Sequence, residues 1–192
     1  MAGTRDGDVM AVRVALVSGS TRAGSTNTAA LRTAAGLEIP GIAAVAWARL
    51  VDLPAFVPDD GAPPPAAVVA LRELLAAADA VVFCTPEYAG TLPGSLKNAI
   101  DWLVGSGELY RKPAAWINVG ARGRGAGAEA TLATVLGYVD ADVIGAACVR
   151  IPVARDAVGA DGLVHDPEVR ARLAAQLATV AAHVRSAPSH SR

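Results

Sequence analysis

Apolar runs and amphipathic stretches alternate along most of the chain. Five short runs rich in Val, Ile, Leu and Ala have the length of buried strands, and they cover residues 12–18, 45–50, 80–85, 114–119 and 143–151. A stretch with apolar residues at helical spacing follows each run and predicts helices over about residues 25–37, 66–78, 93–104, 127–138 and 167–184. This alternation indicates a parallel sheet with helices on both faces, because each parallel return needs a crossover.

The chain fits one domain of this α/β class. Its 192 residues and 53% hydrophobic content suffice for a sheet that is covered on both faces. We expect the domain to span residues 11–185, between a loose N-terminal tail over residues 1–10 and a disordered C-terminal tail over residues 186–192. Ligands of such sheets bind beyond the carboxyl ends of the strands. The loops after the first, third and fourth strands therefore form the candidate site.

Composition and charge exclude several classes of partner. A formal net charge of -1, from 17 basic and 18 acidic side chains, provides no field that would draw nucleic acid or an acidic membrane. The N-terminus is unlike a secretion signal and no apolar stretch is long and clean enough to cross a bilayer, so we expect a cytoplasmic protein. The two cysteines, Cys84 and Cys148, cannot form a disulfide framework and are expected to be small buried hydrophobes within strands.

The loop after the first strand is rich in hydrogen-bond donors. Its candidate phosphate ligands are Ser18, Ser20, Thr21, Arg22, Ser25, Thr26, Asn27 and Thr28. Because a helix N-terminus offers unpaired N–H groups and the positive end of the helix dipole, these donors predict an anion site. An ordinary helix cap by Ser25 or Asn27 is the simpler alternative, but a cap needs only one or two such residues.

The same loop matches a nucleoside-triphosphate loop only in part. Gly19 and Gly24 have the GxxxxG spacing of that motif, but Ser25 stands where the motif requires lysine. Without this lysine, no side chain of the motif would neutralise the charge of the β- and γ-phosphates of a nucleoside triphosphate. One arginine with several hydroxyls is better matched to a monophosphate.

The loop after the third strand opens a longer pattern. Residues 86–102 read Pro-Glu-Tyr-Ala-Gly-Thr-Leu-Pro-Gly-Ser-Leu-Lys-Asn-Ala-Ile-Asp-Trp. Together with Gly-Ser-Thr-Arg-Ala-Gly-Ser-Thr-Asn over residues 19–27, this segment resembles the NADPH-dependent FMN reductase family, whose pattern here is close to Pro-Glu-Tyr-Asn-x-x-x-Pro-Gly-x-Leu-Lys-Asn-Ala-Ile-Asp-Trp. Order, spacing and strand placement agree from about Val12 to Val184.

The resemblance implies a three-layer, flavodoxin-like, doubly wound sheet of five parallel strands in the order 2-1-3-4-5. It implies FMN as cofactor and NADPH or NADH as co-substrate, with the phosphate of FMN held by Ser20, Arg22, Ser25 and Asn27. The flavin ring would lie, largely through main-chain contacts, along Pro86, Glu87, Tyr88, Ala89 and Gly90. A homodimer or homotetramer is also implied, with the helix over residues 93–104 as a candidate subunit contact.

One residue departs from the family pattern. Ala89 stands where the family most often has Asn. Ala89 cannot form the side-chain hydrogen bond that an Asn at this position could form with the flavin. The reduction potential of the flavin, or the binding of its polar edge, would then differ. Main-chain contacts would remain.

The helix after this loop is expected to be structural. Thr91 is a candidate N-cap and Pro93 an early-turn residue. Lys97 and Asp101 are spaced as a surface pair, which contributes only about 0.3 to 0.5 kcal/mol, so we expect them to be structural or to lie at a subunit contact. Trp102 is expected in the core or at an interface.

The loop after the fourth strand is rich in glycine and arginine. Gly123, Gly125 and Ala128 satisfy the G-x-G-x-x-G/A spacing, but the dinucleotide motif belongs to the first strand of its fold and needs an acid after the next strand. We therefore interpret Gly120, Arg122 and Gly123 as part of a loop whose backbone approaches the flavin. Arg122 and Arg124 either bind phosphates of an incoming nicotinamide nucleotide or are solvated cations.

The remaining chemistry of the sequence is sparse. The three histidines show no metal-ligand spacing, so no metal is expected, and no G-x-S-x-G elbow supports hydrolysis. Hydride transfer needs neither, because the isoalloxazine ring carries the reaction.

We predict an FMN-dependent NAD(P)H oxidoreductase that works by ping-pong transfer to a small acceptor: a flavin, a quinone, an azo compound or a metal oxyanion such as chromate. The sequence selects neither the acceptor nor between NADPH and NADH. A flavodoxin-type electron carrier is the main alternative. Such carriers tend to be acidic and to enclose the ring between aromatics, whereas this chain is only 4% aromatic. A flavin-based sensor is a third possibility.

Overall fold

The computed structural model describes residues 10–58 and 61–187. Its parallel sheet has the strand order β2-β1-β3-β4-β5, and a sixth strand also pairs with β4. The strands are β1 (Val12–Ser18), β2 (Ile42–Trp47), β3 (Ala80–Cys84), β4 (Pro113–Asn118), β5 (Asp142–Val143) and β6 (Val149–Arg150). The expected fold class and the order 2-1-3-4-5 are confirmed, with β6 as an addition.

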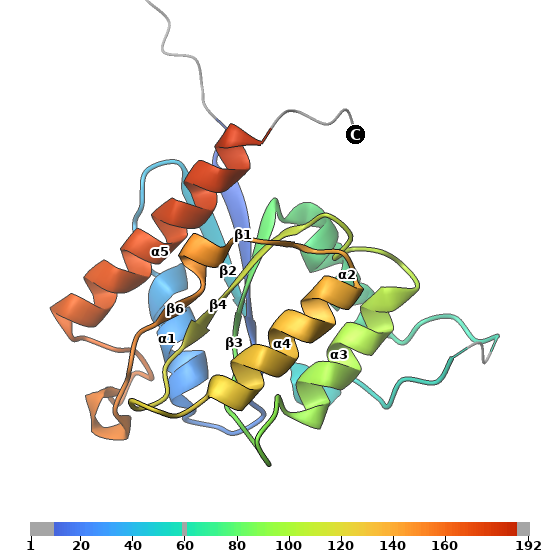
Figure 1. The fold of residues 1–192 in the computed structure, drawn as a ribbon, viewed down its shortest axis with the longest axis horizontal. Coiled ribbons are helices and arrows are strands. Elements are labelled where there is room, and N and C mark those ends of the chain that lie inside the picture. The colour runs from blue at the N-terminus through green and yellow to red at the C-terminus, as the bar shows by residue number, and fades with distance from the viewer. Residues whose placement is uncertain (1–9, 59–60, 188–192) are drawn as a thin grey trace, which may run out of the picture.

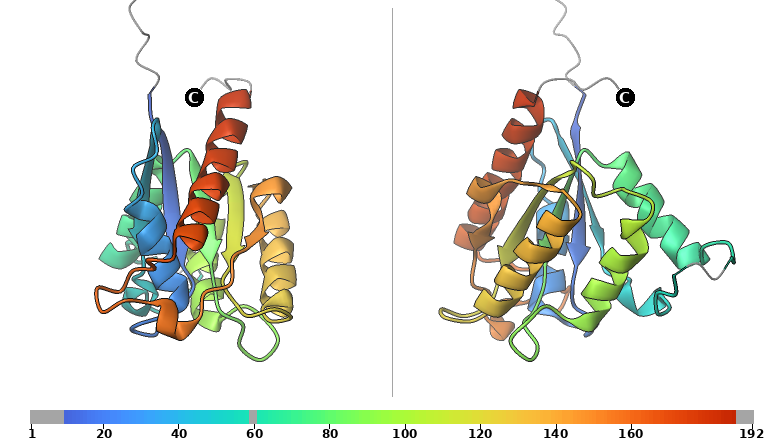
Figure 2. Two further views of the ribbon diagram at one scale, coloured as in Figure 1. Left: turned by 90° about the vertical axis from the view of Figure 1, so that its left-hand side faces the viewer. Right: turned by 45° about the vertical axis from the view of Figure 1, so that its right-hand side comes forward.

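Helices cover both faces of the sheet (Figures 1 and 2). The helices are α1 (Thr26–Ala35), α2 (Ala66–Ala77), α3 (Gly94–Val104), α4 (Ala126–Tyr138) and α5 (Pro167–Ser186). Short 3-10 turns are η1 (Leu50–Asp52), η2 (Gly145–Ala147) and η3 (Arg155–Ala157). One core cluster joins α1 and α5 to the sheet, and a second joins α2, α3 and α4 to the other face. This arrangement gives the three predicted layers.

The sequence of the central strand β1 is almost wholly apolar because both of its faces are covered. Val14 and Leu16 pack into the cluster of α1 and α5, whereas Ala15 and Val17 pack into the cluster of α2, α3 and α4. Successive side chains of a strand point to opposite faces, so a strand that is covered on both faces needs apolar residues at both kinds of position.

Two of the expected strands differ from the structure. The second strand lies at residues 42–47 instead of 45–50, and Leu50 falls in η1. The predicted strand over residues 143–151 is wrong, because η2 separates β5 from β6. Gly145 and Ala146 are exposed and have low strand propensity, so the chain leaves the sheet there. Cys148 consequently lies outside a strand and is only partly buried.

Both chain ends limit what the structure says of the expected tails. The loose tail predicted for residues 1–10 and the disordered tail predicted for residues 186–192 fall mostly on residues 1–9 and 188–192, which lie outside the described residues. Helix α5 itself continues to Ser186. Over the described part of the chain, no helix is both long enough and apolar enough to span a membrane.

Candidate functional site

A cavity of about 330 Å³ opens at the carboxyl ends of β1, β3 and β4. The segments that surround it are the loop between β1 and α1, the loop between β3 and α3, the loop between β4 and α4, and η3. Its lining residues are Arg22, Thr26, Asn27, Thr85, Pro86, Glu87, Tyr88, Asn118, Val119, Gly120, Arg124, Gly125 and Arg155. The cavity lies where the strand pattern predicts a ligand site.

The structure brings part of the predicted residue set to this cavity. Of the predicted ligands, those that line it are Arg22, Thr26, Asn27, Pro86, Glu87, Tyr88 and Gly120. Those that do not are Ser18, Ser20, Thr21, Ser25, Thr28, Ala89, Gly90, Arg122 and Gly123. Sequence reasoning did not name Thr85, Asn118, Val119, Gly125 or Arg155 as ligands. A polar residue at the end of an apolar strand was the available signal for Asn118, whereas Arg155 carries no local signal.

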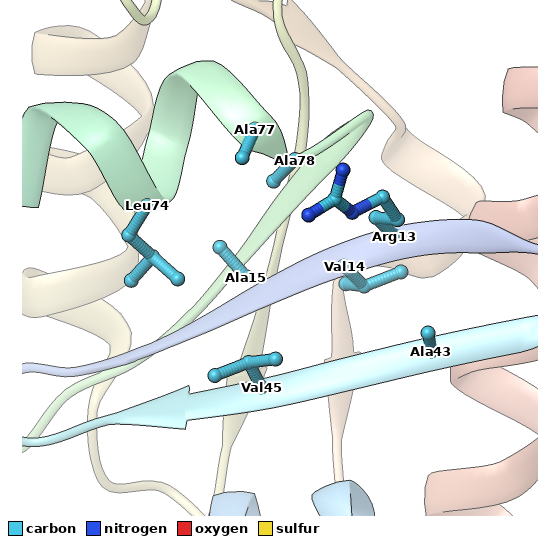
Figure 3. A pocket seen from close by; sticks show the side chains of 8 residues that line it. All are labelled: Arg13, Val14, Ala15, Ala43, Val45, Leu74, Ala77 and Ala78. Carbon is cyan, nitrogen blue, oxygen red and sulfur yellow. The ribbon is translucent and has the colours of Figure 1, made fainter.

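A second hollow of about 70 Å³ lies at the other end of β1 (Figure 3). Arg13 is near the amino end of this strand, and most of the neighbouring side chains are Ala, Val and Leu from β1, β2 and α2. This hollow is small, apolar and remote from the loops that follow the strands. We therefore do not assign it to the site.

Several polar side chains of the first loop fold the loop itself. The Ser18 and Thr28 hydroxyls are 2.8 Å apart and hydrogen-bonded, and the Ser20 N–H donates to Ser18 Oγ at 3.3 Å. The Arg22 N–H in turn donates to Ser20 Oγ. Ser18 and Ser20 are buried. These hydroxyls therefore shape the loop, and Arg22 extends from it to the cavity.

Helix α1 begins at this loop with the features of an anion site. Ser25 is its N-cap and accepts a hydrogen bond from the Asn27 N–H at 3.2 Å. The first turn of α1 contains no acidic residue. The cap interpretation of Ser25 is thus confirmed, and Ser25 itself is buried and does not line the cavity. The positive end of the helix dipole faces the same region.

Cys84 fixes the side chain of Asn27. Its thiol donates to Asn27 Oδ1 at 3.3 Å, and Asn27 Nδ2 donates to Ser25 Oγ at 3.4 Å. Cys84 is fully buried, and burial raises the pKa of its thiol. The thiol therefore remains a protonated donor at neutral pH. Cys84 is buried as predicted, and it also orients a residue of the cavity wall.

The second loop turns sharply at its tip. The N–H groups of Tyr88 and Thr91 donate to each other's carbonyl oxygens, at 3.0 and 3.1 Å. Ala89 and Gly90 between them have φ values of 51° and 75°. Positive φ at both central residues defines a type I′ turn, for which Asn-Gly is the preferred sequence. The Asn that is usual in the family therefore suits the backbone at position 89, where alanine is strained.

The second loop also docks on the N-terminus of α4. Glu87 Oε2 accepts hydrogen bonds from the N–H groups of Gly127 and Ala128, at 2.7 and 3.2 Å. A Cβ at Gly127 would come closer than 3.0 Å to the main chain of Gly90. The Glu87 carboxylate thus caps a helix whose own N-cap, Gly125, has no side chain. Glu87 lines the cavity, but its carboxylate is bonded to protein N–H groups.

Thr91 adds to the same contact. Its hydroxyl donates to Thr131 Oγ1 in α4 at 2.8 Å. The prediction that Thr91 caps α3 is wrong, because the N-cap position is Pro93 and no side chain bonds there. The hydroxyl of Thr91 is used between loop and helix instead. Together these contacts hold the second loop against α4.

Asn118 organises the third loop. Its Oδ1 accepts from the Gly120 N–H at 2.8 Å, and its Nδ2 donates to Arg124 O at 3.1 Å and to Glu129 Oε1 at 2.6 Å. Arg150 forms a 3.2 Å ion pair with Glu129 and also donates to Arg124 O. The loop from Gly120 to Arg124 is therefore wrapped around one buried amide.

The charge of the cavity wall is positive. Arg22, Arg124 and Arg155 line it, and Glu87 is the sole carboxylate among the lining residues of this cavity. The Glu87 carboxylate is hydrogen-bonded to N–H groups at the start of α4. Its negative charge therefore compensates the positive end of the α4 dipole and leaves the charges of the three arginines in place. Arg122 is exposed and lies outside the lining.

The residues that the sequence assigned to structure behave accordingly. Lys97 Nζ and Asp101 Oδ1 are 2.6 Å apart on α3. Trp102 is buried and its Nε1 donates to Pro54 O at 2.9 Å, so its expected place in the core is confirmed. Among the described residues, no group of three or more His, Cys, Asp or Glu side chains could hold a metal ion.

The fold and the site define a class of protein. A sheet of order 2-1-3-4-5 with a cavity at the carboxyl ends of its strands, beside the first turn of the first helix, defines a flavodoxin-like protein.

Comparison with known proteins gives the family. The model of the NADPH-dependent FMN reductase family matches residues 12–156. An NAD(P)H-dependent FMN reductase of Pseudomonas aeruginosa is 37% identical over 180 residues, which cover 91% of this chain and 96% of that protein. The chain belongs to the NADPH-dependent FMN reductase family, and it is an NAD(P)H-dependent oxidoreductase with FMN as its cofactor.

Other relatives agree with this membership. A quinone reductase of Escherichia coli K12 is 40% identical over 96 residues, which cover 48% of this chain and 50% of that protein. The structure of FerB, a flavoenzyme NAD(P)H:(acceptor) oxidoreductase from Paracoccus denitrificans, has a TM-score of 0.71 and 29% identity. That comparison covers 91% of this chain and 97% of FerB.

The residues of the cavity fit FMN. The N-terminus of α1 and Arg22 supply N–H groups and a cation for a phosphate, and the first turn of α1 has no acid to repel it. Pro86, Tyr88 and Gly120 provide main chain and an aromatic side chain at the other two loops. The single lining carboxylate is already hydrogen-bonded. An anionic, planar cofactor therefore meets no unpaired negative charge.

Proposed function

We propose that this protein is a ping-pong reductase, in which NAD(P)H and a small electron acceptor use the same open site in turn. The redox chemistry would be that of bound FMN, which would allow a hydride to be taken from NAD(P)H and two electrons to be delivered to the acceptor. The observation that carries the proposal is the convergence of the three loops on one cavity, whose lining includes Arg22 and the first turn of α1 from one loop and Pro86 to Tyr88 from another.

The roles of the residues follow from their positions. Arg22 and Asn27, which line the cavity, hold the phosphate of FMN at the N-terminus of α1, where Ser25 is the N-cap. Pro86 to Tyr88 and Gly120 lie along the ring, and Glu87 keeps the first of these segments docked on α4. No lining side chain is required to exchange a proton with the coenzyme. The chain's contribution is binding, orientation and positive charge.

The acceptor is proposed to be a small oxidant such as a quinone, a flavin, an azo compound or chromate. Names of relatives support this range, because they include a quinone reductase of Escherichia coli and an NADPH azoreductase of Bacillus sp. strain OY1-2. Tyr88 is 52% exposed at the cavity wall, which leaves room for a planar acceptor beside it.

Anaerobic stopped-flow mixing tests the proposal. The FMN-loaded protein should lose its visible flavin absorbance within seconds after NADPH is added and regain it when a quinone is added. Initial rates at several fixed quinone concentrations should give parallel double-reciprocal lines. Slow or absent bleaching would favour the electron carrier or sensor, and intersecting lines would exclude the ping-pong order.

The coenzyme phosphates are proposed to contact Arg124, with Arg122 as a second candidate. Both side chains are exposed, but Arg124 lines the cavity and Arg122 does not. Arg124→Ala should raise the KM for NADPH, and Arg122→Ala should raise it less. Unchanged KM values for NADPH and NADH in both variants would refute this assignment.

We also propose that the protein is a homodimer or homotetramer whose subunit interface includes α3. We propose that it is located in the cytoplasm, where reduced nicotinamide coenzymes are supplied. Val104, at the end of α3, is half-exposed, and so is Val57. The residue before Val57, Phe56, packs edge-on against Trp102 of α3. Light scattering should give an oligomer, and Val104→Asp should shift it towards the monomer. Cell fractionation checks the location.

A further inference from the structure

Arg155 reaches the cavity from outside the three loops that the sequence motifs mark. It is the first residue of η3, and it lines the same cavity as Arg22, Thr26 and Asn27. The chain before it runs beside the end of β4, where the Ile151 N–H donates to Asn118 O at 2.8 Å and the Val153 N–H donates to Val119 O at 3.0 Å. Main-chain hydrogen bonds therefore place η3 at the carboxyl end of the sheet.

The segment that contains Arg155 lies on the same face of the sheet as α1. Ala157 and Val158 pack against the core cluster of α1 and α5. Farther along, the Val164 N–H donates to Thr33 Oγ1 of α1 at 2.8 Å, in a buried position. Figure 2 shows this segment passing beside α1 at the lower edge of the sheet. Arg155 therefore lies on the α1 face of the sheet, and it lines the same cavity as Thr26 and Asn27 in the first turn of α1.

The charges at this side leave a role for a second cation. A phosphomonoester carries about -1.5 to -2 charges near pH 7. The N-terminus of α1 supplies the equivalent of about half a positive charge, and the first loop contributes one arginine, Arg22. The helix end and Arg22 together supply about 1.5 positive charges, which leaves a doubly ionised phosphate incompletely offset, and Arg155 raises the local positive charge to about 2.5, which offsets it fully.

Arg155 is available for this contact. It is exposed, and within residues 10–58 and 61–187 its guanidinium makes no hydrogen bond or ion pair with another side chain. Arg150, by contrast, is held by Glu129 and by the main chain of Arg124. Of these two neighbouring arginines, Arg155 is the one whose donors are left for a ligand.

We propose that Arg155 is a second phosphate-binding cation for FMN, in addition to Arg22 of the same cavity. The inference rests on FMN binding at this cavity. It assigns a binding role to a residue that no motif of the chain marks, and it divides the phosphate site between loop one and the segment that follows β6.

Flavin titration of the full-length protein, freed of bound flavin, tests this role. Flavin fluorescence is followed with FMN and with riboflavin, which lacks the phosphate. Arg155→Ala should weaken FMN binding about ten- to a hundredfold, as expected for loss of a charge-assisted hydrogen bond, and should leave riboflavin binding unchanged. Arg155→Lys should restore part of the difference, because the charge is kept and the planar fork is lost.

Arg13→Ala is the matched control. It removes one exposed cation at the opposite end of β1 (Figure 3), so it should change neither FMN nor riboflavin binding. High salt should weaken FMN binding more in the wild type than in Arg155→Ala.

The outcomes separate this inference from the proposed function. Equal FMN affinity in the wild type and Arg155→Ala overturns the role of Arg155 alone. Equal weakening of FMN and riboflavin shows a structural role and also overturns it, as does a rise in the KM for NADPH without a change in FMN affinity. If the wild type binds neither flavin, the proposed function fails together with the inference.

Discussion

Replacing Ala89 by Asn should stabilise the protein. Ala89 has a φ of 51° in a type I′ turn, next to Gly90 at 75°. A left-handed conformation costs a residue with a Cβ about 1 to 2 kcal/mol, and Asn offsets part of this by local hydrogen bonds. We therefore expect Ala89→Asn to raise the free energy of unfolding by about 0.5 to 1 kcal/mol. For a domain of this size, that corresponds to about 1 to 4 °C in Tm.

Thermal unfolding of the flavin-free protein, followed by circular dichroism, measures this shift. Ala160→Asn is the control, since Ala160 is an exposed loop residue that lacks a positive φ. Ala89→Gly should change Tm little, because glycine relieves the same strain but increases the entropy of the unfolded chain. Ala89 is exposed and outside the cavity lining, so FMN affinity should stay the same. A Tm that does not rise above the control, or a gain seen only with FMN bound, would refute the turn-strain explanation and favour a flavin contact.

Other predictions follow from contacts around the cavity. Gly127→Ala should lower Tm and weaken FMN binding, because the new Cβ would clash with the main chain of Gly90. Gly137→Ala is the control in the same helix: a Cβ there has no atom within 4 Å, so this change should raise the free energy of unfolding by about 1 kcal/mol. Glu87→Ala should cost about 0.5 to 2 kcal/mol in urea unfolding, as for loss of a helix cap, and Glu87→Gln should cost less; equal stability of all three proteins would contradict the capping role. Burial raises the pKa of the Cys84 thiol, so the folded protein keeps this proton to higher pH than the unfolded chain does. Its contribution to stability is complete below a pH of roughly 8.5 and is lost as the pH rises above that value. In Cys84→Ala, Tm should therefore fall less steeply with rising pH above this value than in the wild type. A thiol reagent should modify Cys84 of the wild type only when the protein unfolds.

The apolar pattern was sufficient to predict the layers and most elements. Covered parallel strands are apolar at every position, so runs such as residues 80–84 stand out, and the strand order followed from the family resemblance. The break at Gly145 was not predicted, because a single apolar run does not show where two short edge strands leave the sheet. Thr91 was misassigned for a similar reason, since its partner, Thr131, is distant in sequence.

The candidate site was predicted as three loops but not in its details. Local sequence offered Ser25 as one of two alternative caps and named Arg22 as the cation of the first loop. It could not show that Ser18 and Ser20 hydroxyls are used within the loop, because that depends on the path of the folded chain. Arg155 is brought to the cavity by pairing along β4 and by packing on α1, and both are tertiary effects.

The docking of the second loop on α4 has a consequence for protein engineering. Glu87, Gly127 and Thr131 connect two walls of the cavity, so substitutions at this contact in one wall would disturb the other. Tyr88 and Arg124 face the same cavity, and neither side chain takes part in that link. Directed evolution towards a new electron acceptor should therefore vary these two positions and keep the glycine and the carboxylate constant.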